Sequence, residues 1–599
     1  MDDKRNLFAA IGLSLLVLVG WQYFITPRFI KPVPVETQAT QPASPTASAT
    51  GAAPAANGAG APSAPVAPAA IPAAATQLTR EEALKASPRV QISSAHLSGS
   101  LALKGGRIDD LTLTQYRETP DRGSPQIVLL SPAHTEGAFY ADFGLLAEGK
   151  GDAPDADTLW QASGDKLTPT TPVTLTWTNP QGVEFKREIS LDDNYMFNVT
   201  DTVTNHGTQA LSVYPYAAVI REGTPKVAGY YVLHEGLVGY VGGDGLEEWT
   251  YAKLDKEGTK SVKGTGGFVG ITDKYWAAAV IPDQTKPYDA RFVSTTGGQK
   301  LYQADLREGA LDIAPGASAT ASRRLFAGAK VVQLVDNYEK QLGIKSFDLI
   351  IDWGWFYFIT KPLFQVIDFF NTVLGNFGLA ILLVTVLLKL LFFPLANKSY
   401  ASMAKMKAVQ PQLKELQERY KDDKAKLQQE MMALYKRERI NPVAGCWPML
   451  IQVPVFFALY KVIFTTIEMR QAPFYGWIHD LSAPDPTSVF NLFGLIPVTL
   501  PHFLVLGAWP LIMGVTMFVQ MKMNPEPPDP AQKMMFTWMP LIFTFMLSSF
   551  PAGLVIYWSW NNTLSVLQQG FIMKKHGVKI ELWDNLRKLF VGKTTPSTA

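Results

Sequence analysis

The sequence predicts an α-helical membrane core of six spans, counting an N-terminal anchor, joined to a large all-β sandwich domain on the outer side of the membrane. Three observations predict this class. Of the 599 residues, 47% are hydrophobic and 18% are charged, a composition between those of soluble and fully membrane-embedded proteins. Apolar helical runs fill residues 375–573, whereas residues 76–335 alternate in hydrophobicity between frequent turn residues. The net charge of +2 hides an excess of lysine and arginine in the segments assigned to the cytoplasm.

Residues 1–31 predict an uncleaved signal anchor with its N-terminus inside. Lys4 and Arg5 precede an uncharged run, residues 7–25, that is longer than the core of a usual signal peptide. No small-x-small cleavage site directly follows this run, and a cleaved signal peptide is the alternative interpretation. Residues 32–75 are mostly Pro, Ala, Thr, Ser and Gly, so they predict a disordered tether that has too few large apolar groups to fold.

Residues 76–335 predict the β-sandwich. Residues 173–177 alternate between apolar and polar side chains, and Phe185, Arg187 and Ile189 repeat with the same period of two. Many short strands with few helical runs favour two packed sheets over a helical or mixed fold.

This domain contains no recognisable acid-base or metal-ligating cluster, so we predict no catalytic residue, no metal and no cofactor. The single cysteine of the chain, Cys446, excludes an internal disulfide and a cysteine metal cluster, so the core alone must stabilise the exported domain. The histidines are scattered, as is typical of loop or core residues rather than of a catalytic site; they are His96, His134, His206 and His234.

Two amphipathic helices are predicted between the β domain and the core. Residues 330–342 predict a short one, and residues 346–374 predict a helix that lies in the membrane interface. Aromatic side chains crowd this second segment, and Asp352, Lys361 and Asp368 place charges at its ends and in its middle. A genuine membrane span is the alternative, because the run is otherwise apolar.

The helix predicted over residues 377–396 carries one cation, Lys389, inside an apolar run. Gly375 and Asn376 precede it and break the previous helix. An ionisable group in the hydrocarbon zone is costly and persists when it snorkels, finds a partner or faces water. Two interpretations of Lys389 stay open from the residues alone: its stem carries the ammonium to the cytoplasmic headgroups, or the ammonium faces a hydrated groove.

A helical hairpin is predicted over residues 397–441, with Pro411 starting or kinking its first helix. Eleven Lys and Arg against six Asp and Glu place it in the cytoplasm. A solvated loop is the simpler interpretation, and a docking arm for lipid headgroups, RNA or a passing polypeptide is the more specific one. With the basic tail, residues 574–599, both termini are predicted to be cytoplasmic. The remaining spans of the five-helix core, residues 375–573, are predicted at residues 445–464, 502–521, 534–550 and 552–572.

Several sequence blocks in residues 346–573 together resemble the YidC/Oxa/Alb family of membrane-protein insertases, in its Gram-negative form. The blocks fall in the family's order, which makes the resemblance specific. The N-terminal anchor, the tether and the β domain are similar to the additional parts of the Gram-negative members. The blocks are Ser402–Met406, Gln429–Tyr435, Asn441–Pro442 with Gly445–Pro448, Arg470–Phe474 with Trp477–Leu481, and Pro551–Trp558.

The resemblance implies five core helices around a hydrophilic groove that is open to the cytoplasm and to lipid and that holds one cation. That cation is usually arginine in the family, and Lys389 occupies the matching position, which keeps the charge but loses the two-pronged guanidinium. For Asn561 and Asn562, interhelical hydrogen bonding is the commoner explanation. The groove residues that we predict are Lys389, Thr385, Gln452, Tyr557, Trp558, Asn561 and Asn562.

A family member of this kind is an inner-membrane protein with a periplasmic domain. It moves nascent hydrophobic segments from the cytoplasm into the membrane and assists membrane-protein folding without enzymatic chemistry. The partners that the resemblance implies are nascent membrane proteins, components of the Sec translocon, membrane lipids, and the ribosome through the hairpin and the tail. Two rival classes are a transporter, for which the spans show neither paired half-repeats nor a deep acid, and a tethered envelope enzyme with a sugar-mutarotase-like sandwich, for which fold analogy carries no activity.

Overall fold

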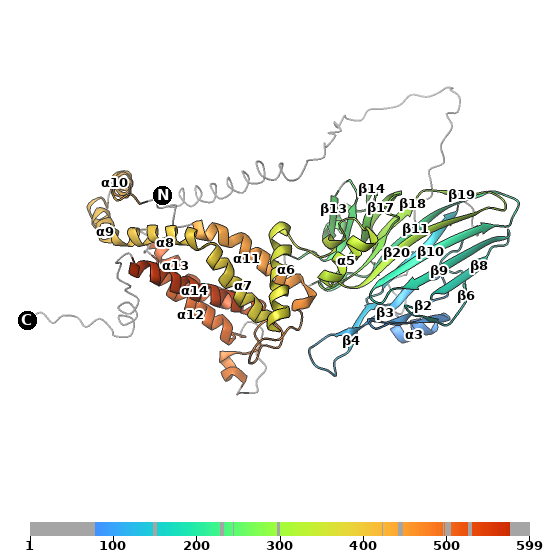
Figure 1. Ribbon diagram of the computed structural model, residues 1–599, viewed down its shortest axis with the longest axis horizontal. Helices are drawn as coiled ribbons and strands as arrows, with labels where there is room; N and C mark the ends of the chain where they lie inside the picture. Colours follow the sequence, from blue (N-terminus) through green and yellow to red (C-terminus); the bar gives the residue numbers. More distant parts are fainter. Residues whose placement is uncertain are drawn as a thin grey trace, which may run out of the picture. The chain divides into compact units, whose positions relative to one another are not determined.

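The structure is a computed structural model, and it describes residues 78–147, 152–227, 233–243, 245–295, 300–421, 423–440, 447–494, 496, 505–524 and 530–575. The predicted anchor of residues 1–31, the predicted tether of residues 32–75 and the tail beyond residue 575 lie outside the described residues. Apart from two short helices, strands make up the first part of the described chain, and a run of helices follows (Figure 1).

The strands form two sheets that share one apolar core, which confirms the predicted all-β domain (Figure 1). The larger sheet has the order β14 (Lys260–Thr265), β17 (Pro287–Thr295), β18 (Leu301–Glu308), β11 (Leu211–Glu222), β5 (Phe139–Ala147), β3 (Ile108–Arg117), β2 (Leu97–Ala102), β1 (Arg89–Ser93) and β7 (Lys166–Leu167), with β19 (Leu311–Ile313) beside β11 and β4 (Gln126–Leu130) beside β3. The smaller sheet has the order β13 (Gly245–Thr250), β12 (Gly236–Val241), β15 (Gly267–Thr272), β16 (Trp276–Ile281), β20 (Ser318–Ala329), β10 (Met196–Asn205), β9 (Val183–Leu191), β8 (Val173–Thr178) and β6 (Gln161–Ala162).

The alternation seen in the sequence sets which side chains enter the core. In β9, Phe185, Arg187 and Ile189 are all buried, and the residues between them are more exposed. In the antiparallel register of β9 and β10, Asp201 lies directly opposite Arg187. A strand with period two therefore carries one charged pair into the core together with its apolar neighbours.

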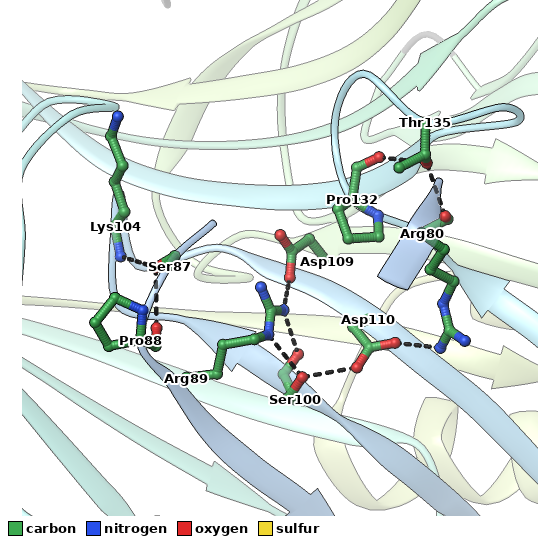
Figure 2. A network of polar contacts seen from close by, with 11 residues as sticks. Arg80, Ser87, Pro88, Arg89, Ser100, Lys104, Asp109, Asp110, Pro132 and Thr135 are labelled. Atoms are coloured by element: carbon green, nitrogen blue, oxygen red, sulfur yellow. Dashed lines mark hydrogen bonds and ion pairs between the residues drawn. The ribbon is translucent and has the colours of Figure 1, made fainter. Parts of the chain in front are cut away.

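Near the start of the described chain, one ion pair joins helix α3 (Arg80–Lys85) to the larger sheet, and a second ion pair lies within that sheet. Figure 2 shows Arg80 paired with Asp110 and Arg89 paired with Asp109. Ser100 lies between the two pairs, accepting from Arg89 Nε at 2.7 Å and donating to the Asp110 carboxylate at 2.7 Å. Each buried charge at the start of the domain therefore has a partner of opposite sign, which avoids the cost of an isolated buried charge.

The helices that follow the β domain belong to the region predicted as interfacial helix and core. Helix α4 (Tyr251–Glu257) lies within the β domain. The others are α5 (Val332–Leu342), α6 (Tyr357–Leu374), α7 (Phe377–Leu391), α8 (Phe393–Ala408), α9 (Gln410–Arg419), α10 (Lys424–Arg437), α11 (Trp447–Thr465), α12 (Ala508–Met523), α13 (Pro530–Met546) and α14 (Ala552–Lys575), with short 3-10 turns at Phe347–Ile350, Ile467–Met469, Val489–Gly494 and Leu547–Ser549.

The helix that carries Lys389 is shorter than the sequence predicts. The predicted helix runs from residue 377 to residue 396, but α7 ends at Leu391, and α8 leaves it at an angle of 69°. Pro394 lies in the first turn of α8 and explains the break: it has no N–H to give the carbonyl of Leu390, and its ring collides with that carbonyl in a continuous helix. Lys389 is therefore in the last turn of its helix.

Within the part of the chain that the structure describes, no single helix reaches the length and apolarity of a membrane span, and the bent pair of α7 and α8 has both when taken together. The count of six spans stays a prediction.

The predicted hairpin of residues 397–441 consists of three helices rather than two. Helix α8 runs into it, α9 begins at Gln410 with Pro411 in its first turn, and α10 follows. The proline therefore starts the second helix of the segment, one of the two roles predicted for it. Apolar residues of this segment form a small separate core, which is made of Val409, Leu413, Leu434, Tyr435 and Ile440 with Met406, Leu416 and Met431 around it.

Buried polar contacts join the β domain to the segment after α11. Glu468, in the turn that follows α11, accepts a hydrogen bond from the backbone N–H of Val332 at 2.8 Å, at the start of α5. Its other carboxylate oxygen is buried without a hydrogen-bond partner among the described residues. Burial raises the pKa of Glu468 to about 7, and Asp368 on α6 adds to the rise.

We expect Glu468 to make the folded protein less stable as the pH rises. Because its pKa in the folded protein lies above the value of an exposed glutamate, the stabilisation is complete below about pH 4.5 and is lost as the pH passes about 7. A rise of this size corresponds to as much as about 3 kcal/mol. Thermal unfolding of the intact protein in detergent between pH 5 and pH 8 measures the loss.

The Glu468→Gln variant keeps an acceptor for the Val332 N–H and should remove most of this pH dependence. Glu118→Gln, an exposed carboxylate, is the matched control and should leave the wild-type slope unchanged. An equal slope in all three proteins would show that Glu468 does not titrate in this range.

Candidate functional site

Lys389 and Ser565 join two helices of the core. The Lys389 ammonium donates to Ser565 Oγ at 2.8 Å, from the last turn of α7 to α14. The Ser565 hydroxyl in turn donates to the carbonyl of Asn561 at 2.8 Å, so its oxygen is free to accept from the lysine. Ser565 is buried and Lys389 is half-buried. The cation is therefore held between helices and is bonded to a neutral hydroxyl.

A cavity of about 50 Å³ opens beside this cation, large enough to hold water. Its walls come from α7, the start of α8, α11 and α14. None of the described residues that line it is acidic, so the charge of Lys389 is not neutralised by a carboxylate within the cavity. The lining residues are Thr385, Leu388, Lys389, Phe392, Leu395, Ala396, Tyr400, Gln452, Val455, Tyr557, Asn561 and Gln568.

Five of the seven predicted groove residues line this cavity. Thr385 lies one turn before Lys389, and its hydroxyl donates back to the carbonyl of Ile381 at 2.7 Å. Gln452 Nε2 on α11 donates to the hydroxyl of Tyr557 on α14. The others in the cavity wall are Lys389, Tyr557 and Asn561.

The remaining two, Trp558 and Asn562, are not among the described residues that line this cavity, and their place in the groove stays a prediction. The ring centroids of Trp558 and Phe456 lie 4.5 Å apart. Asn562 Nδ2 donates to Thr516 Oγ1 on α12 at 3.4 Å. Consecutive residues of a helix point about 100° apart, so Trp558 and Asn562 project away from the directions of Tyr557 and Asn561, which line the cavity. For Asn562, interhelical hydrogen bonding is the observed role.

Sequence reasoning missed Ser565 and Gln568, which share the cavity side of α14 with Tyr557 and Asn561. The signal was present in the spacing. Residues 557, 561 and 565 follow one another at intervals of four, and residue 568 is three further on, which is the repeat of one helix face.

Three carboxylates outside the cavity come close enough to hold a metal ion. One oxygen each of Asp336, Glu339 and Asp348 lies within 4.8 Å of the others. The Lys361 ammonium lies between them, 2.9 Å from Asp336 Oδ1 and 2.7 Å from Asp348 Oδ2. A cation of the chain itself therefore pairs with two of the three carboxylates.

The structure combines an all-β domain with a helical region that holds a partly buried cation. Residues 89–366 match the family model of the YidC periplasmic domain, and residues 369–579 match that of the 60Kd inner membrane protein. The chain belongs to the YidC family of membrane protein insertases, whose function is not enzymatic.

Relatives match over nearly the whole chain. A membrane protein insertase YidC of Methylobacterium radiotolerans is 60% identical and that of Beijerinckia indica 58%; the matches cover 98% of this chain in both, and 98% and 99% of those proteins. The chain is also similar to a solved structure described as an active YidC insertase with the first transmembrane domain resolved. That likeness covers 80% of this chain and 92% of the other at 16% identity and a TM-score of 0.34, too low to carry an argument.

Proposed function

We propose that the cavity around Lys389 receives a short polar or acidic segment of a nascent membrane protein as it moves from the cytoplasm into the inner membrane. The observation that carries this proposal is a partly buried ammonium that contacts a hydroxyl, Ser565, and has no carboxylate among the described cavity residues. An incoming carboxylate supplies the missing opposite charge. No covalent step is involved, and the same surface assists folding of the inserted protein.

Water and polar groups in the cavity lower the cost of moving a polar segment part-way across the membrane. A polar group in pure hydrocarbon loses its hydrogen bonds, at a cost of roughly 2–7 kcal/mol. The cavity offers donors from Lys389 and Gln452 and the hydroxyl of Tyr557. The bond from Lys389 to Ser565 on a second helix favours the groove interpretation over a lysine that snorkels to the headgroups.

The apolar part of the client leaves the groove along exposed apolar helix faces. Helix α13 presents such a face, and burial of about twenty apolar residues in lipid drives release. Methionine suits a surface that meets many clients, because its side chain adapts its shape. The exposed residues of this face are Met534, Met535, Trp538, Leu541, Ile542 and Phe545.

Helix α6 is proposed to lie in the interface on the outer side of the inner membrane. Phe358, Val366, Phe369 and Val373 recur at intervals that place them on the same side of the helix, and all are exposed. The opposite side, with Leu363, Phe364 and Ile367, is buried. Membrane lipid is the partner that covers such an aromatic stripe.

The basic hairpin and the tail are proposed to contact the ribosome, and the insertase to work both alone and beside the Sec translocon. Helices α8 to α10 carry exposed cations, which suit an RNA surface. They include Lys398, Lys405, Lys436 and Arg437.

Insertion of a single-span client with an acidic tail into liposomes tests the proposal. Lys389→Arg should keep insertion within about twofold, whereas Lys389→Ala and Lys389→Glu should lower its rate by about tenfold or more, the factor that corresponds to losing one charge-assisted contact. Arginine keeps the positive charge, alanine removes it and glutamate repels the client.

Lys340→Ala is the matched control, since Lys340 is an exposed lysine of α5 outside the cavity wall; it should insert the client like the wild type. Equal rates for all Lys389 variants would overturn the proposal and assign the function to other surfaces.

A further inference from the structure

Gln568 on α14 brings an unused hydrogen-bond donor to the cavity. Its side chain lines the wall, and its amide nitrogen, Nε2, is buried without a hydrogen-bond partner among the described residues. An unpaired buried amide destabilises a protein, so it calls for an explanation. An acceptor that enters the cavity with a client provides one.

Gln568 and Lys389 are placed to act together. Gln568 follows Ser565 by three residues, so the two share a side of α14, and Ser565 is the residue that the Lys389 ammonium contacts at 2.8 Å. Both Lys389 and Gln568 line the one cavity. The lysine ammonium has only donors, and the amide nitrogen adds another, so this part of the wall is complementary to an acceptor with two oxygens.

The geometry points to a two-donor cradle in which Lys389 binds one oxygen of a client Asp or Glu carboxylate and Gln568 Nε2 binds the other. This inference rests on the proposed function and names the recognition residue that deepens it. An arginine grips both oxygens with its own planar fork, whereas a lysine provides a single point charge. Gln568 supplies the second prong that lysine lacks, and so makes the site selective for carboxylates.

The test compares two clients that differ only in one residue of the translocated segment, Asp or Asn. The measured quantity is the ratio of their insertion rates into liposomes. For the wild type the Asp client should insert faster, and Gln568→Leu should lower this preference by about tenfold, the factor for one hydrogen bond to a charged group. Gln569→Leu is the matched control: Gln569 is buried beside it but donates to Met523 and Asn524 on the α12 side. It should leave the preference unchanged, whatever it does to the overall rate.

The same substitution in the Lys389→Arg variant tests whether Gln568 acts as the second donor beside the lysine. In Lys389→Arg, adding Gln568→Leu should change the preference by less than about twofold, because arginine supplies both prongs and the two substitutions are not additive. A tenfold loss in both backgrounds would overturn the cradle. So would an unchanged preference in Gln568→Leu. A thermal unfolding scan guards against misfolding, since removal of an unpaired amide should leave the stability equal or higher.

Lipid phosphate is the other source of paired oxygens. The measurements are therefore repeated in liposomes of zwitterionic lipid alone and with added anionic lipid. A Gln568 effect that appears with anionic lipid and is equal for the Asp and Asn clients would show a headgroup in the cradle and overturn the inference. If instead Lys389→Ala inserts clients normally, the proposed function itself fails; if Lys389→Ala fails to insert and Gln568→Leu keeps the preference, only the cradle fails.

Discussion

Asp201→Ala should destabilise the β domain by about 3–5 kcal/mol, enough to unfold a typical domain in part of the population. Asp201 lies inside the sandwich between two arginines. Arg187 Nε donates to its Oδ1 at 2.7 Å, and Arg323 pairs with its Oδ2. The three side chains are at most 2% exposed. Alanine would leave two buried guanidinium groups with no counter-charge.

Through Arg323, this cluster of Asp201, Arg187 and Arg323 also holds the two sheets together. It lies on β20 of the smaller sheet, and its Nη1 donates to the carbonyls of Gly144 at 3.2 Å and Tyr216 at 2.6 Å, both on the larger sheet. Arg187 in turn lies over the ring of Trp160, 5.1 Å from its centroid. Loss of Asp201 therefore affects contacts on both sides of the core.

Thermal unfolding of the intact protein, together with trypsin cleavage at residues of the β domain, measures the effect. Asp157→Ala is the matched control: Asp157 pairs with Lys104, but the Asp157 side chain is 84% exposed, so the substitution should leave the stability of the domain nearly unchanged. Equal stability of the two variants would contradict the view that the buried triad holds the sandwich.

Local periodicity explains how much of this fold the sequence could predict. Alternation in β9 placed Phe185, Arg187 and Ile189 on one face, and that face is buried. The partners of Arg187 could not be read from the same pattern. Asp201 is opposite because of strand register, and Arg323 reaches it from a strand more than a hundred residues later.

The candidate site shows the same division. The apolar run around Lys389 predicted a helix and a cation that needs a partner, but it did not predict that the partner is Ser565, which lies 176 residues further along the chain. Polar residue type alone grouped Trp558 and Asn562 with Tyr557 and Asn561, whereas helix rotation separates them. Helix α7 ends at Leu391 because Pro394 prevents a hydrogen bond to the carbonyl one turn earlier. The continuous apolar run around Pro394 gave no sign of this helix end.

Lys461→Met should be the second strongly destabilising change, again by about 3–5 kcal/mol, because it leaves the carboxylate of Asp352 buried without its cation. Lys461 is near the end of α11, and its ammonium lies 2.6 Å from Asp352 Oδ2. The same oxygen accepts the backbone N–H of His234 in the β domain at 2.8 Å. Asp352 thus joins the β domain, the segment before α6 and α11.

The local backbone is built for this contact. Gly354 has φ +73, a conformation that favours glycine, and a side-chain carbon added there would come within 2.7 Å of Lys461 Cε, so the lysine stem would have to shift. The lysine and the aspartate side chains are 11% and 12% exposed, which is why neither is expected to find water when the other is removed.

A double substitution separates the lost pair from a general packing defect. Asp352→Asn in the Lys461→Met variant removes the unpaired charge and keeps an oxygen that can accept from the His234 N–H. It should therefore restore most of the stability, and a double-mutant cycle measures this coupling. Thermal unfolding in detergent gives the free energies, and Lys340→Met, an exposed lysine of α5, is the control. If Lys461→Met matched that control, or if the double variant were no more stable than the single one, the ion pair would not be what joins the β domain to the membrane core.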